Sequence, residues 1–79
     1  MYEKTVNDVQ LNDCLAKENY LEATQMLIKE LKINREKYPE NSMLENIYAS
    51  VMGVANRPGM AAKSVYDLVH SMRDVLLWA

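Results

Sequence analysis

Residue types that build specialised sites are scarce in this 79-residue chain, which contains one cysteine, one histidine, two glycines, two prolines and no phenylalanine. The single cysteine, Cys14, can form no disulfide within the chain and no multi-thiolate metal site. So few glycines and prolines exclude collagen-like and low-complexity structure. No run reaches the roughly 18 apolar residues of a membrane helix, and residues 1–8 hold no apolar export segment. We therefore expect a cytoplasmic protein that is neither exported nor inserted into a membrane.

The chain also lacks a dominant charge. Nine Lys and Arg stand against eleven Asp and Glu, which gives a formal net charge of −2, and the basic residues are scattered. A protein that neutralises a run of phosphates needs clustered cations. Nucleic-acid binding is therefore not expected.

What is present is the composition of an ordinary globular domain, with 49% hydrophobic and 25% charged residues. We predict one domain over residues 1–79. A chain of this length buries only about 60% of its extended surface on folding, so its core is small. A protein partner or self-association is therefore expected to add to its stability.

Four segments with helical spacing of apolar residues are separated by turn-forming residues at Asn19, 38–41 and 56–59. No segment alternates apolar and polar residues over more than a few positions, which excludes amphipathic strands. We predict an all-α fold, a small bundle of three to four antiparallel helices arranged as helical hairpins. The fourth segment, which begins near Pro58, has the longest apolar stripe and is expected to be the central packing element.

Three of the predicted helices begin with residues typical of a capping box, in which a polar side chain caps the helix and a residue three positions later reaches back. The pairs are Asn7 with Gln10, Asn19 with Glu22, and Ser42 with Glu45. In the first helix, the predicted apolar stripe includes Val6, Val9 and Leu11. In the second, basic residues are concentrated in the last turns, where the helix dipole favours them.

The middle of the chain resembles the helical hairpins of tetratricopeptide repeats. In that family a tyrosine is followed three residues later by a small alanine at a close helix crossing, and Tyr20 and Ala23 stand in these places. Residues 38–41 are similar to the turn between repeats. Ala62 follows Ala23 by 39 residues, against a family period of about 34, and the glycine and tryptophan of the family motif are missing. The resemblance implies a concave surface that binds a peptide or partner, with Ala23 and Ala62 at close crossings.

Patterns typical of catalysis or metal binding are missing. His70 is the only imidazole base, and it lies beside an apolar stripe, as a histidine at the edge of a core does. Asp67 and His70 are three residues apart, too small a ligand set for a metal ion. Cys14 follows Asp13 rather than a cation, which is typical of a structural thiol. We predict no catalytic residues, no metal and no cofactor, and therefore no enzyme.

Six methionines and five tyrosines are the unusual feature of the composition. Methionine adapts to irregular surfaces and tyrosine combines apolar area with a polar tip, so both are common where a protein accepts a partner, although both also fill cores. We predict a partner-binding surface where the third and fourth helices meet at the 56–59 turn. Its residues are Tyr48, Met52, Arg57, Met60 and Tyr66. The cationic side of the second helix, around Lys29, Lys32 and Arg35, is the alternative binding face.

These features predict a non-enzymatic helical protein that binds and occupies or inhibits a protein partner. Inhibitors, antitoxins, immunity factors and small chaperones act in this way, and compact chains of this kind are often encoded by phages or other mobile elements. We also predict a homo-oligomer whose interface includes Leu76, Leu77 and Trp78, because burying Trp78 alone removes about 150–250 Å² from water.

The alternative hypothesis is an oligomeric protein that binds a small ligand or nucleotide. In this case Tyr48 or Tyr66 would stack on a base, while Arg57 or Lys63 would contact a phosphate.

Overall fold

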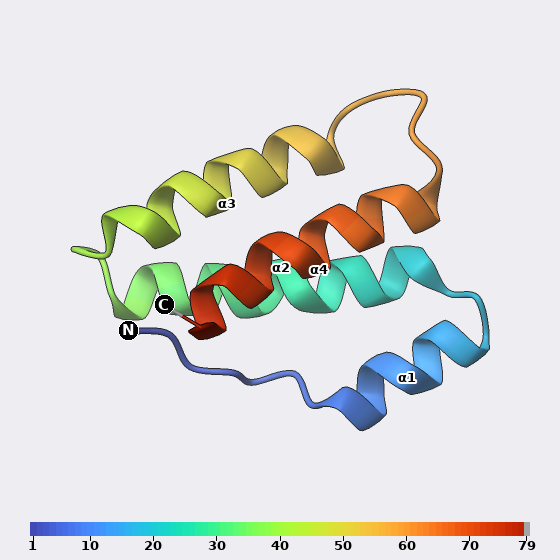
Figure 1. Cartoon of the computed structure of the whole chain (residues 1–79), viewed down its shortest axis with the longest axis horizontal. Helices are drawn as coiled ribbons and strands as arrows, with labels where there is room; N and C mark the ends of the chain where they lie inside the picture. The colour runs from blue at the N-terminus through green and yellow to red at the C-terminus, as the bar shows by residue number, and fades with distance from the viewer. Residues whose placement is uncertain (79) are drawn as a thin grey trace.

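Residues 1–78 contain four α-helices in the computed structural model of the chain (Figure 1): α1 (Asp8–Ala16), α2 (Tyr20–Lys37), α3 (Ser42–Ala55) and α4 (Ala62–Trp78). The structure describes residues 1–78, and this part of the chain contains no strand. The predicted small all-α bundle is therefore confirmed. None of the helices described is both long and apolar enough to cross a membrane.

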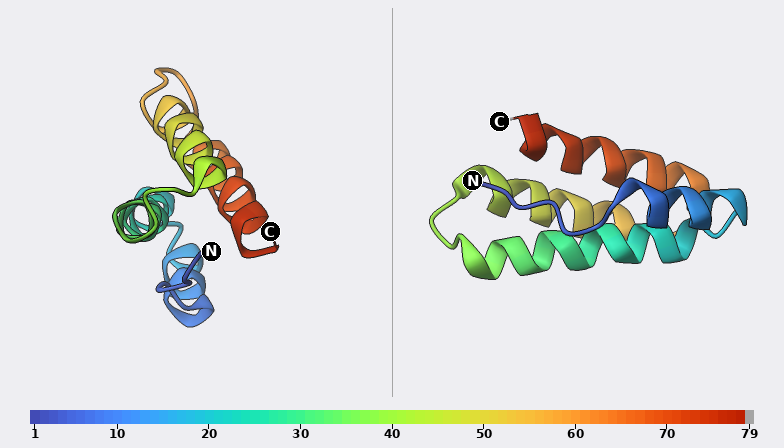
Figure 2. Two further views of the ribbon diagram at one scale, coloured as in Figure 1. Left: turned by 90° about the vertical axis from the view of Figure 1, so that its left-hand side faces the viewer. Right: turned by 90° about the horizontal axis from the view of Figure 1, so that it is seen from below.

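The helix at the centre of the arrangement is α2 rather than α4. α2 packs against α1, α3 and α4, whereas α4 packs against α2 and α3. Seen from one end, α3 and α4 lie side by side as one layer, with α2 against one side of it (Figure 2). The prediction that α4 is central was wrong because it counted apolar residues alone. α2 also buries three polar residues, Thr24, Glu30 and Asn34.

The first two helices begin at the predicted caps. The Gln10 amide donates to Asn7 Oδ1 at 2.8 Å, and the Asn7 amide donates to Gln10 Oε1 at 3.3 Å, so the capping box is complete. Asn19 Oδ1 accepts a hydrogen bond from the Glu22 amide at 3.3 Å. The Glu22 carboxylate bonds the Asn19 side chain rather than its backbone.

The cap of α3 is Asn41 rather than the predicted Ser42. Asn41 is extended, with φ −78° and ψ 95°, and its Oδ1 accepts from the Leu44 amide at 3.1 Å. Ser42 is already the first helical residue. Glu45 is therefore not used in capping, and it binds Arg35 of α2 instead.

α4 begins at Ala62, four residues later than predicted from Pro58. Gly59 follows this proline with φ +84°, a left-handed conformation that ends any continuous helix and that other residues rarely adopt. Ala62, the first residue of α4, is exposed, while Ala23 is fully buried in α2. Of the two predicted close crossings, only the one at Ala23 lies in the core.

Leucine and valine side chains from α2, α3 and α4 form the centre of the core. Those with no exposed surface are Leu27, Leu31, Leu44, Val51 and Val69. Among the helices, α1 packs only on α2, and it does so with one narrow face that buries Leu11 and Cys14. Val9, which was predicted to join this stripe, is therefore 77% exposed.

Candidate functional site

A groove opens between α2, the C-terminal end of α3 and the segment that leads into α4. It has a volume of about 370 Å³. Most of its lining is apolar, and Arg57 is its only charged residue. The lining residues are Leu21, Thr24, Gln25, Ile28, Met52, Ala55, Asn56, Arg57, Met60, Ala62 and Val65.

Local hydrogen bonds shape the groove and leave one charge free. Asn56 caps α3, and both its backbone and side-chain N–H groups donate to the Met52 carbonyl, at 3.1 and 2.9 Å. The Thr24 hydroxyl donates to the Tyr20 carbonyl at 2.8 Å. Within residues 1–78, Arg57 forms no ion pair. Its guanidinium is therefore available to an anionic group of a binding partner.

Three of the five predicted partner-binding residues meet in this groove, namely Met52, Arg57 and Met60. They converge because Gly59 reverses the chain between α3 and α4.

The two predicted tyrosines lie elsewhere. The Arg35 guanidinium lies over the Tyr48 ring at 4.8 Å from its centroid and also binds Glu45, with bonds of 2.8 and 2.9 Å. Tyr66 is in the core, 6% exposed, with the Tyr20 ring centroid at 6.2 Å. Burial is the main reason why the pKa of Tyr66 is raised.

The three residues predicted for an oligomer interface have different environments. Leu76 is 4% exposed and belongs to the core, because it continues the buried line of Val69 in α4. Leu77 is half-buried, whereas Trp78 is 88% exposed. Of the three, Trp78 therefore has the most surface available to a second molecule.

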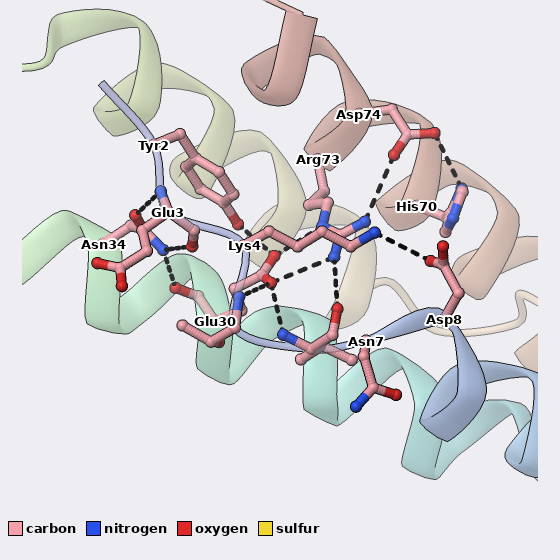
Figure 3. Close-up of polar contacts among 12 residues, drawn as sticks. Tyr2, Glu3, Lys4, Asn7, Asp8, Glu30, Asn34, His70, Arg73 and Asp74 are labelled. Atoms are coloured by element: carbon pink, nitrogen blue, oxygen red, sulfur yellow. Dashed lines mark hydrogen bonds and ion pairs between the residues drawn. The ribbon is translucent and has the colours of Figure 1, made fainter.

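A buried ion pair between α2 and α4 was missed by the sequence analysis (Figure 3). Arg73 Nε lies 2.6 Å from Glu30 Oε2, and both side chains are almost without exposed surface. The same carboxylate accepts hydrogen bonds from the Tyr2 hydroxyl at 2.6 Å and from the backbone amides of Thr5 and Val6 at 2.7 and 2.9 Å. The pair therefore holds the extended N-terminal segment against the bundle.

Asn34, one turn after Glu30, binds the backbone of the same segment. Its Oδ1 accepts from the Glu3 amide at 2.6 Å, and its Nδ2 donates to the Glu3 carbonyl at 2.8 Å. Among the residues described, no buried side-chain nitrogen or oxygen lacks a hydrogen-bond partner. With every donor and acceptor paired, this network is a structural clamp for residues 1–7.

The electrostatics of the clamp follow from its geometry. Burial by itself would raise the pKa of Glu30, but hydrogen bonds from Arg73, Tyr2 and the backbone outweigh it, so the pKa is lowered. The pKa of Tyr2 is raised, first by burial and then by its hydrogen bond to Glu30. The clamp therefore consists of a carboxylate, a guanidinium and a neutral phenol.

One signal in the sequence marks this network. Arg73 stands four residues after Val69 and three before Leu76, within the apolar stripe of α4, and Glu30 stands beside Leu31 and three residues after Leu27. A charged residue in an apolar stripe is buried only when it is paired. Two such residues of opposite sign on neighbouring helices therefore indicate a buried ion pair.

The remaining candidate groups have ordinary local partners. His70 Nδ1 lies 3.4 Å from Asp74 Oδ2, four residues further along α4. Cys14 is buried, with its Sγ 3.8 Å from Met26 Sδ. In the part of the chain that the structure describes, no three His, Cys, Asp or Glu side chains are grouped to hold a metal ion.

Comparison of the chain with protein-family models, with curated proteins and with solved structures found no match.

Proposed function

We propose that this protein is a cytoplasmic, non-enzymatic helical protein that binds a protein partner at the groove between α2 and α3 and thereby occupies or inhibits that partner. The observation that supports the proposal is the combination of an apolar lining with a single unpaired cation, Arg57. A partner segment that carries an apolar side chain next to a carboxylate would complement both features. We further propose that the chain belongs to the inhibitor, antitoxin, immunity or small-chaperone type, encoded by phages or other mobile elements.

The groove suits an anchor-type contact. Methionine lines irregular surfaces and adapts to different side chains, and Met52 and Met60 flank the groove beside Arg57. Arginine is one of the residue types in which interface free energy concentrates. Leu21, which is 64% exposed, extends the apolar surface along α2.

The alternative hypothesis of a nucleotide-binding protein has less support in this arrangement. It requires a tyrosine ring that stacks on a base near the cation. Tyr66 is buried, and the Tyr48 ring already lies against Arg35. Neither tyrosine lines the groove with Arg57.

Affinity capture from the native host tests the proposal with matched variants. Tagged parent, Arg57→Glu, Met60→Lys and the control Lys32→Glu are compared, and the captured partner is then titrated with each purified protein. We expect at least a tenfold weaker dissociation constant for the two groove variants, which is about 1.4 kcal/mol. Circular dichroism checks that all four remain helical.

The control variant Lys32→Glu also tests the alternative binding face, the cationic side of α2. A partner that binds the Arg57→Glu and Met60→Lys variants like the parent, but not Lys32→Glu, would place binding on the cationic side of α2. The groove proposal would then be refuted.

A further inference from the structure

The main chain of the extended N-terminal segment is bound by side chains of the bundle (Figure 3). Six hydrogen bonds join backbone groups of Met1, Glu3, Thr5 and Val6 to these side chains. Almost every residue type carries the same backbone N–H and C=O groups, so these six bonds do not depend on the sequence of the segment. We call residues 1–7 the strap. The strap site consists of Glu30, Asn34, Asn41 and Arg73.

Only two side chains of the strap are turned into the bundle. Val6 is buried, and Tyr2 is half-buried with its hydroxyl on Glu30, whereas the other five residues are exposed. In an extended chain, residues four positions apart lie on the same face, about 13 Å from each other. Bonds to the main chain combined with places for alternate side chains are how proteins recognise extended peptides. The strap is therefore bound as an extended peptide would be.

The strap is separable from the bundle. Its release exposes one buried and one half-buried side chain, which is little apolar surface. Glu30 and Arg73 remain hydrogen-bonded to each other when the strap leaves, and water takes the vacated bonds. Segments with few buried apolar contacts open at a lower free energy than the core. We therefore expect the strap to open while the helices stay packed.

The strap leaves part of its own site unfilled. A hollow of about 310 Å³ lies beside it, lined by Lys4 and by residues of α4 that include Trp78. Lys4 is two residues from both Tyr2 and Val6, but its ammonium group pairs with Asp8, and Trp78 is 88% exposed. An apolar side chain in place of Lys4 would cover part of this indole. A different segment can therefore fit the site better than the strap does.

We propose that the strap is an intramolecular occupant of a peptide-binding site, and that an extended segment of a partner protein displaces it. That segment carries a tyrosine, an apolar residue two positions later, and a β-branched residue after two more. Attachment to the same chain gives the strap an effective concentration in the millimolar range, so a poorly fitting segment does not displace it. The strap of a second copy has the same lysine and gains nothing over the strap already bound.

This site is independent of the groove at Arg57. Glu30 follows Leu21 of the groove by nine residues, which is two and a half helical turns, so the two sites lie on opposite sides of α2. The test of the strap site therefore does not depend on what binds in the groove.

Amide hydrogen exchange in the parent protein tests whether the strap opens. The amides of Glu3, Thr5 and Val6 should exchange at least tenfold faster than those of Leu31 and Val69 in the core. Their exchange should also be insensitive to low concentrations of urea, because local opening exposes little surface. Exchange of the strap amides at the rate of global unfolding would overturn the proposal.

A synthetic peptide tests the site directly. The probe has the sequence Met-Tyr-Glu-Leu-Thr-Val-Asn, in which leucine replaces the lysine of the strap, and a fluorescent label at its C-terminus. It is titrated by anisotropy into the full-length parent and into the full-length double variant Tyr2→Ser with Val6→Ser, whose strap is weakened. The dissociation constant should be at least tenfold lower for the double variant, because less of the site is occupied by its own strap.

Matched peptides and protein variants test the specificity. In the peptide, restoring the lysine should weaken binding about tenfold, and an aspartate in place of the valine should weaken it at least as much. A serine in place of the glutamate should change binding less than twofold, because Glu3 is exposed in the strap. In the double variant, Asn34→Leu should weaken binding at least tenfold, whereas the control Lys32→Glu, at an exposed position of α2, should not.

Three results of the titrations would overturn the proposal. The first is no binding to the double variant at 1 mM while circular dichroism shows it helical. The second is equal affinity for parent and double variant, because the peptide would then bind another surface. The third is equal affinity of the leucine and lysine peptides, because a second copy would then fit as well as a partner. If the double variant is unfolded, the exchange rates in the parent decide.

Discussion

Replacing Glu30 by Gln would remove the charge on which the N-terminal clamp depends. The Glu30 carboxylate accepts five hydrogen bonds: two from Arg73, and one each from Tyr2, the Thr5 amide and the Val6 amide. A glutamine presents one acceptor oxygen and one NH₂ group, so some of these donors would face another donor. Arg73 would also remain buried with only the partly exposed Asp74, whose Oδ1 lies 3.5 Å from Arg73 Nη1, as a counter-ion.

The expected magnitude is large for a protein of this size. Breaking a buried pair by removing one partner costs about 3–5 kcal/mol. At roughly 0.05–0.15 kcal/mol per residue, a chain of 79 residues has an unfolding free energy of about 4–12 kcal/mol. Glu30→Gln should therefore remove about a quarter of the unfolding free energy or more. Arg73→Met should cost less, because Glu30 keeps three hydrogen bonds to the N-terminal segment.

Urea unfolding followed by circular dichroism at pH 7 measures these losses. The double variant Glu30→Leu with Arg73→Met should cost less than the sum of the single losses, because it leaves no unpaired charge. Amide exchange at Thr5 and Val6 should still accelerate in it, since both amides lose their acceptor. A loss below about 1 kcal/mol for Glu30→Gln would refute the reasoning, because it would mean that the pair is not buried.

Two further predictions concern pH and packing. The pKa of Tyr2 is raised in the fold, so its contribution to stability is present below its ordinary pKa of about 10 and is lost as pH rises above that value. The urea midpoint should therefore decrease more between pH 8 and pH 11 for the parent than for Tyr2→Phe, and an equal decrease in both proteins would contradict this. Ala23→Leu should overpack the core and cost about 1–3 kcal/mol, whereas Ala62→Leu, at an exposed position, should melt within a few degrees of the parent; similar melting of the two variants would show that Ala23 is not confined.

At acidic pH the stability that the clamp provides depends on Glu30. Its pKa is lowered in the fold, so its stabilising contribution is present above its ordinary pKa of about 4.3 and is lost as pH falls through the lowered value. The clamp is therefore complete across neutral pH, when Glu30 is ionised and Tyr2 is neutral.

The candidate site could be predicted in part. Met52, Arg57 and Met60 were placed together because the turn at 56–59 brings the end of one helix to the start of the next, and this is a local property of the chain. Tyr48 and Tyr66 lie outside the groove because the direction of a side chain around a helix depends on where neighbouring helices pack. For a residue at the edge of an apolar stripe, the sequence pattern does not specify where the neighbouring helix packs.

The sequence by itself determined the helices, because apolar spacing, caps such as Asn7 and the left-handed Gly59 act within a few residues of one another. The tertiary structure alone decided the partners of these helices. Glu30 and Arg73 are 43 residues apart, and only packing of α2 against α4 removes both from water and makes their pairing necessary. The packing of the helices also made α2 the central helix and placed residues 1–7 against it. Local forces specify elements, whereas burial, which needs distant surfaces to meet, specifies their arrangement.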